Sequence, residues 1–102
     1  MVSATLIFEN KVFVKHDRLE KDAVVELKVW ELPTSHKYPQ GLKYSLFCVE
    51  IESKRIIVGI DNHHPKSHHI HFGEIEEHYF FESVEKLIDD FYSFVSARGY
   101  SI

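Results

Sequence analysis

The spacing of apolar side chains predicts a chain that is mainly β-sheet. Apolar and polar residues alternate with a period of about two in segments 23–32 and 43–52, as in strands that bury one face. Runs rich in apolar and β-branched residues predict further extended segments at 4–14 and 55–60, and two short ones are expected at 69–72 and 75–81. Segment 4–14 is either one bent strand or a short hairpin, and the β-branched segment 55–60 is expected at the centre, buried on both faces. The sheet should be mainly antiparallel, with about five to six strands.

One segment has the helical period instead. Between Val84 and Arg98, apolar residues recur three or four positions apart and form a single stripe. Ser83 is a suitable N-cap, and Gly99 follows as a helix-ending glycine. Strands followed by one amphipathic helix predict a single α+β domain over residues 1–102, with the helix packed on one face of the sheet.

Composition agrees with one globular domain and narrows its environment. A chain of 102 residues with 44% hydrophobic and 27% charged residues can bury a core without disulfides or a structural metal. The single cysteine, Cys48, excludes an internal disulfide, so a reducing cytoplasm is expected. The sequence has no apolar stretch long enough to span a membrane and no signal-peptide pattern at its start, so no membrane association is expected.

Histidine is concentrated in one place. Five of the eight histidines lie between His63 and His71, directly after the expected central strand, where loops often carry function. The net charge of −4 argues against a generally basic nucleic-acid binder. The segment 60–102 nevertheless carries six of the histidines, and its charge is therefore the most sensitive to pH.

The first interpretation of this His-rich loop is a metal site. His69 and His71 are two positions apart, and in a strand both would face the same side. Asp61, His63 or His64 can add a third ligand for a divalent ion such as zinc. No established metal-binding motif accompanies them in the sequence.

The second interpretation is acid–base chemistry that needs no cofactor. Two imidazoles can remove one proton and deliver another, while a carboxylate such as Asp61 fixes one tautomer. RNA cleavage needs these two groups and a cation for the phosphate, for which Lys66 or Lys43 is available, and the aromatic ring of Tyr44 can line a cleft. The third interpretation is a solvated polar tract without a function of its own.

The order of the features along the chain is more specific than any one of them. The features, in order, are the strand 25–30 ending in Trp30, Pro33, the strand that starts at Lys43-Tyr44, the pair Asp61-Asn62, the motif His69-Ile70-His71, and the aromatic run 79–81 before the helix. Over roughly residues 20–95 this order resembles the TumE-type small proteins, which are regarded as toxin components of prokaryotic type II toxin–antitoxin systems.

The resemblance implies a small toxin paired with a cognate antitoxin. RNA cleavage is the common activity of small toxins, so RNA is the favoured target by analogy. The catalytic residues that the resemblance favours are Asp61, Asn62, His69 and His71, and the expected substrate-binding residues are Lys43, Tyr44 and Lys66. The alternative is a non-catalytic domain that binds a protein partner, or zinc through His69 and His71. A homodimer stays open for either function.

Overall fold

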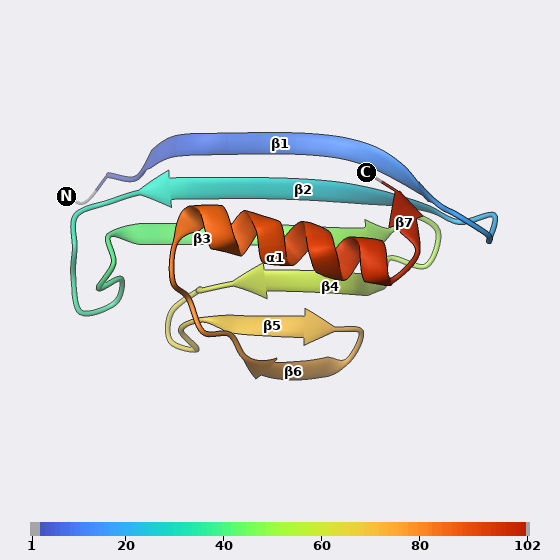
Figure 1. The fold of residues 1–102 in the computed structure, drawn as a ribbon. Helices are drawn as coiled ribbons and strands as arrows, with labels where there is room; N and C mark the ends of the chain where they lie inside the picture. Colours follow the sequence, from blue (N-terminus) through green and yellow to red (C-terminus); the bar gives the residue numbers. More distant parts are fainter. Residues whose placement is uncertain (1–2, 102) are drawn as a thin grey trace.

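The computed structural model describes residues 3–101, which form one antiparallel sheet and one helix (Figure 1). The elements are β1 (Thr5–His16), β2 (Asp22–Glu31), β3 (Leu42–Glu50), β4 (Ile56–Asp61), β5 (His69–Phe72), β6 (Ile75–His78), α1 (Val84–Ala97) and β7 (Tyr100–Ser101). The spatial order of the strands is β6-β5-β4-β3-β2-β1-β7. Strands β1 to β6 are thus neighbours in space as they are in sequence.

The expectation of five to six strands is wrong, because the sheet has seven. Segment 4–14 belongs to one long strand, β1, which has an irregular register with β2 between Leu6 and Phe8. The additional strand is β7, whose two residues pair with the end of β1. A strand of two residues has no alternation of its own, so the apolar spacing could not predict it.

The sheet curves into a half-barrel, and α1 lies across its inner face (Figure 1). The core between them is built from every second residue of the central strands, as alternation requires. Its buried side chains include Val25, Leu27, Val29, Leu46, Cys48, Val58 and Ile60 from the sheet and Leu87, Phe91 and Val95 from the helix. Each such side chain contributes roughly 1.5–3 kcal/mol when it is fully buried.

The helix begins and ends close to the positions that its sequence predicts. The Ser83 hydroxyl accepts a hydrogen bond from the N–H of Lys86, as an N-cap does. Gly99 follows the helix with φ +91°, a conformation that favours glycine. This turn directs the chain back toward β1 and allows β7 to pair there. No helix in residues 3–101 is long and apolar enough to cross a membrane.

Strand β4 lies between β3 and β5, and its middle residues Val58, Gly59 and Ile60 are buried on both faces, as expected, whereas Asp61 at its end is only partly buried. Val58 and Ile60 point to the helix and are fully buried. Gly59 and Asp61 alternate with them and therefore point to the opposite side, here called the outer face of the sheet. The helix α1 covers the inner side, while on the outer side the Phe47 ring covers Gly59 and Asp61 is only partly buried.

Candidate active site

Strand pairing brings one carboxylate and two imidazoles together on the outer face. Asp61, the last residue of β4, lies directly opposite His69, the first residue of β5. His71 lies two residues further along β5 and so on the same face. Candidate ligand atoms of these three side chains lie within 4.8 Å of one another, and the two imidazole rings meet edge to face with centroids 4.8 Å apart. We call these three residues the His–Asp cluster.

The two ring nitrogens of His69 have different partners. Nδ1 lies 2.8 Å from the carbonyl oxygen of Ser67, which can only accept, so Nδ1 carries a hydrogen. Nε2 lies 2.5 Å from Oδ1 of Asp61. This oxygen is buried and has no other polar partner among residues 3–101. Two lone pairs at that separation repel each other, so a proton or a bound cation must lie between the two atoms.

Glu76 and Lys66 extend the cluster toward β6. Nδ1 of His71 lies 3.9 Å from Oε2 of Glu76, and Nζ of Lys66 lies 3.1 Å from both oxygens of the same carboxylate. The hydrogen bond from Lys66 lowers the pKa of Glu76, which keeps Glu76 ionised at neutral pH. Lys66, expected to bind substrate, therefore has its ammonium at the edge of the cluster. Glu76 was missed by the sequence analysis, because only the β5–β6 pairing brings it opposite His71.

Two hollows adjoin the cluster. One has a volume of about 350 Å³ and is lined by Asp61, His63, His64, Pro65, Lys66, His69 and His71. The other, of about 360 Å³, shares Lys66 and His69 with the first and extends along β6. Hollows of this size can accept a group as large as a nucleotide.

Gly59 and Phe47 form the wall beside His71. The Phe47 ring lies so close over Gly59 that a Cβ at this position would collide with it. The same ring reaches toward His71, with centroids 6.0 Å apart. A lone glycine inside a β-branched strand is a signal of such a close approach. Gly59 within segment 55–60 is therefore a signal in the sequence for this contact, although the residue that fills the space, Phe47, is set by the β3–β4 pairing.

Asn62 lies next to the cluster but faces the backbone of β3. Its Oδ1 accepts a hydrogen bond of 2.8 Å from the N–H of Tyr44, and its Nδ2 donates one of 2.8 Å to the carbonyl of Leu42. The side chain is buried, and both polar ends are engaged in these bonds. Asn62 therefore fastens the end of β4, next to Asp61, and does not join the cluster.

Tyr44 points to the helix side and contacts a different histidine. Its hydroxyl donates a hydrogen bond of 2.7 Å to Nδ1 of His68, whose Nε2 donates to Oε1 of Gln40 at 3.3 Å. The His68 ring stacks on both Tyr44 and Phe81. Burial raises the pKa of Tyr44 and lowers the pKa of His68, so both are neutral at physiological pH. Successive residues of an extended segment point to opposite faces, so the sequence could have shown that His68 faces inward once His69 is placed on the outer face.

Lys43 lies on the outer face but outside the cluster. Its Nζ stands 5.5 Å from the centre of the Trp30 ring, which it contacts as a cation over an aromatic face. Ser45 is the β3 residue opposite Asp61, and Lys43 follows two positions away on the same face. The structure thus brings together Asp61, His69, His71 and Lys66, and it leaves Asn62, Tyr44 and Lys43 around them.

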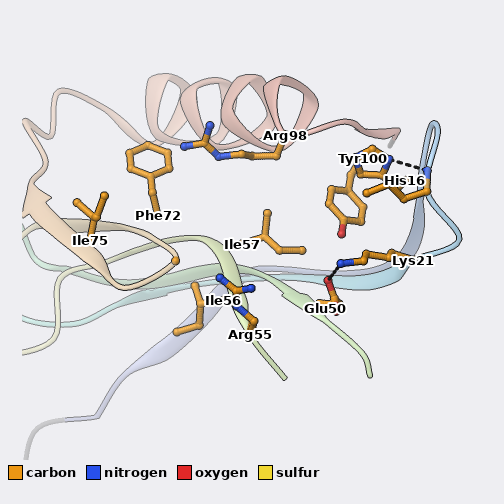
Figure 2. A pocket seen from close by; sticks show the side chains of 12 residues that line it. His16, Lys21, Glu50, Arg55, Ile56, Ile57, Phe72, Ile75, Arg98 and Tyr100 are labelled. Carbon is orange, nitrogen blue, oxygen red and sulfur yellow. Dashed lines mark hydrogen bonds and ion pairs between the residues drawn. The ribbon is translucent and has the colours of Figure 1, made fainter. Parts of the chain in front are cut away.

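A separate cavity, of about 420 Å³, lies near the C-terminal end of α1 and the start of β7 (Figure 2). Lys21 on its wall is paired with Glu50 at 3.5 Å, and the Arg98 guanidinium lies over the ring of Phe72. Its histidine, His16, accepts two backbone hydrogen bonds through Nδ1. Among its lining residues no second histidine stands beside His16. The acid–base candidates are therefore concentrated in the His–Asp cluster.

Comparison with known families identifies the class of this protein. A family model of a toxin matches residues 3–99, so the protein is a toxin-like component of a toxin–antitoxin system, and an antitoxin partner is implied. The family is that of toxin TumE, and the chain belongs to it. This confirms the resemblance and extends it over nearly the whole chain. Comparisons with the curated proteins and with the solved structures give no match.

Proposed function

We propose that this toxin acts in the cytoplasm by cleaving RNA through proton transfer between His69 and His71. The observation that carries the proposal is the His–Asp cluster, where two imidazoles and a carboxylate meet at the rim of two hollows. Acid–base catalysis of RNA cleavage requires two such groups within reach of one phosphate. Membership of a toxin family supports RNA as the target by analogy.

Each group of the cluster has a role in this reaction. His71, the more exposed of the two imidazoles, takes the proton from the 2′-hydroxyl. The 2′-oxygen then bonds to the adjacent phosphorus, and the bond to the 5′-oxygen breaks. The proton for that leaving oxygen comes from Nε2 of His69, the nitrogen that faces Asp61, so the leaving oxygen approaches the ring on its Asp61 side. The products are a 2′,3′-cyclic phosphate and a free 5′-hydroxyl, and Lys66 offsets the charge on the phosphate.

Inducible expression with and without the antitoxin, followed by analysis of RNA integrity, tests the proposal. His69→Ala and His71→Ala should each lower RNA cleavage by about 10²-fold or more and relieve growth inhibition, without loss of the fold. His36→Ala is the matched control, because His36 is exposed in a loop outside the cluster. RNA that is still degraded in both cluster variants would rule out the proposal.

The second candidate is a divalent metal site, and one observation favours it. His69 donates Nδ1–H to a carbonyl and directs Nε2 at a buried, otherwise unpartnered carboxylate oxygen, an arrangement typical of metal-binding histidines. Asp61, His69 and His71 would supply three ligands for zinc. Elemental analysis after dialysis decides between the candidates. Stoichiometric zinc that is lost in Asp61→Asn supports the metal, and metal-free, active protein supports proton transfer.

A further inference from the structure

Strand β1 has an open edge along most of its length. β2 covers one edge, whereas β7 covers the other only at Lys15 and His16. Beside the open part lie exposed apolar side chains, Ile7 at 49%, Phe8 at 37% and Phe13 at 71% exposed. A long open edge with exposed apolar residues is a template for pairing with another strand.

The direction of the backbone groups determines which residues can pair there. The N–H of His16 is directed into the β1–β2 hairpin, and the N–H of Asp17 is directed to the β7 side. Backbone groups point alternately to the two sides of a strand. The odd-numbered residues of β1 share the side of Asp17, so Glu9 and Lys11 present their N–H and C=O groups at the open edge.

We propose that β1 pairs with β1 of a second copy of this chain, antiparallel, about a twofold axis at Asn10. In this register Glu9 stands opposite Lys11 of the second copy, and Lys11 stands opposite its Glu9. Phe8 then stands opposite Val12 of the second copy. Opposite charges and aromatic–aliphatic pairs are the cross-strand combinations that stabilise a sheet.

The neighbouring registers are disfavoured by charge. An axis at Glu9 would place two glutamates opposite each other, and an axis at Lys11 would place two lysines opposite each other. Like charges directly opposite destabilise strand pairing. The run Glu9-Asn10-Lys11 is thus complementary to itself in one antiparallel register, which is the argument for a second copy rather than an unrelated strand.

The dimer would join the two sheets into one. A twofold axis perpendicular to the sheet keeps both outer faces on the same side, so both His–Asp clusters would lie on one continuous surface. The inference does not depend on RNA cleavage, because it concerns β1 alone, and β2 and β3 separate β1 from β4.

Light scattering coupled to size-exclusion chromatography tests the register directly on the full chain. The wild-type protein should have the mass of a dimer. Lys11→Glu and Glu9→Lys should each give monomers, and an equal mixture of the two variants should regain the dimer mass, because their charges then complement each other. Lys15→Glu is the matched control, since Lys15 lies on β1 where β7 already covers the edge, and it should remain dimeric.

Three results would overturn the inference: a monomeric wild type, a dimer that persists in both variants, or a mixture that stays monomeric. Circular dichroism checks that each variant is folded. If a single variant unfolds, the double exchange Glu9→Lys/Lys11→Glu replaces it and should be dimeric. A monomeric wild type whose β1 amides gain protection from hydrogen exchange only with antitoxin would assign the edge to the antitoxin and exclude the second copy.

Discussion

Two adjacent histidines show how neighbours decide the chemistry of a side chain. His69 faces the outer side, where its Nε2 meets a carboxylate oxygen of Asp61. His68 faces inward, stacks on aromatic rings and accepts a hydrogen bond from Tyr44, and burial lowers its pKa. The same residue type is therefore a candidate proton donor at one position and a neutral packing group at the next.

The Tyr44–His68 hydrogen bond leads to a prediction about stability. Tyr44→Phe removes the hydroxyl and leaves Nδ1 of the partly buried His68 without its donor. An unsatisfied buried polar group costs about 1–3 kcal/mol, so the free energy of unfolding in urea should fall by about that amount. RNA cleavage by the folded protein should be unchanged. Tyr38→Phe is the control, since Tyr38 makes only a long contact at an exposed backbone N–H; equal losses in both variants would contradict the prediction.

At the scale of the element, β4 combines a core face with a site face. Its inward residues Val58 and Ile60 pack against α1. Its outward residues are Gly59, which makes room for Phe47, and Asp61, which begins the cluster. A substitution on the outer face of this strand should therefore alter the site before it alters the core.

Gly59→Ala tests this role of β4. The new methyl group collides with Phe47, whose ring must then move away from β4 and change its contact with His71. Overpacking of this kind costs about 1–3 kcal/mol, and RNA cleavage should also fall. The double variant Gly59→Ala/Phe47→Leu, which has room for the methyl group, should recover part of both losses. Losses that simply add in the double variant would mean that the two positions are not coupled.

The helix is joined to the segment before it through Asp90. The Tyr79 hydroxyl donates to Oδ2 at 2.7 Å, and Lys86 contacts Oδ1 at 3.0 Å. Burial by itself raises the pKa of the Asp90 carboxyl, but the hydrogen bonds from Tyr79 and Lys86 outweigh it, and the net pKa is lowered. A carboxyl with a lowered pKa stabilises the fold above the pKa of the unfolded chain, about 4, and this stability is lost as the pH falls through the folded value.

Asp90→Asn should therefore reduce the free energy of unfolding at neutral pH and weaken its fall as the pH drops below about 4. The loss should be at most about 1 kcal/mol, because the carboxylate is partly exposed and screened by solvent. Urea unfolding of wild type and variant at several pH values measures it. Asp89→Asn, one position along the helix, is the control and should behave like wild type. Parallel pH profiles for wild type and Asp90→Asn would contradict the assignment.

At the scale of the whole molecule, the sheet separates the hydrophobic core from the candidate active site. The inner side holds the helix and the core, and the outer side holds the His–Asp cluster, with Lys66 at its edge. The chain as a whole is acidic, with a net charge of −4. An RNA strand would thus be held by few positive groups, and its affinity should depend on salt only weakly.

Salt dependence tests this distribution of charge. If Lys66 contacts a phosphate, Lys66→Gln should weaken RNA binding for all sequences alike. It should also reduce the slope of log affinity against log salt by roughly 1. Lys54→Gln, at the exposed β3–β4 turn, should leave both quantities unchanged. A slope that is the same in Lys66→Gln and wild type would place the phosphate elsewhere.

Local patterns were sufficient for much of the architecture. Alternation located β2 and β3, the β-branched run located β4, and the apolar stripe with Ser83 and Gly99 located α1, because these signals depend on neighbouring residues alone. Two positions in a strand point to the same side, so the pairing of His69 with His71 also followed from spacing. Toxin-family membership was likewise evident from the order of the motifs.

Only the tertiary structure decided the contacts that depend on strand register and on packing between residues far apart in the sequence. The opposition of Asp61 and His69 is a property of the β4–β5 pairing, and the bonds of Asn62 to β3 span about twenty residues of chain. Strand β7 exists because Gly99 returns the chain to β1. A sequence determines which side of its own strand each residue faces, but only the folded sheet decides which residue stands opposite, since that contact joins segments with no local signal in common.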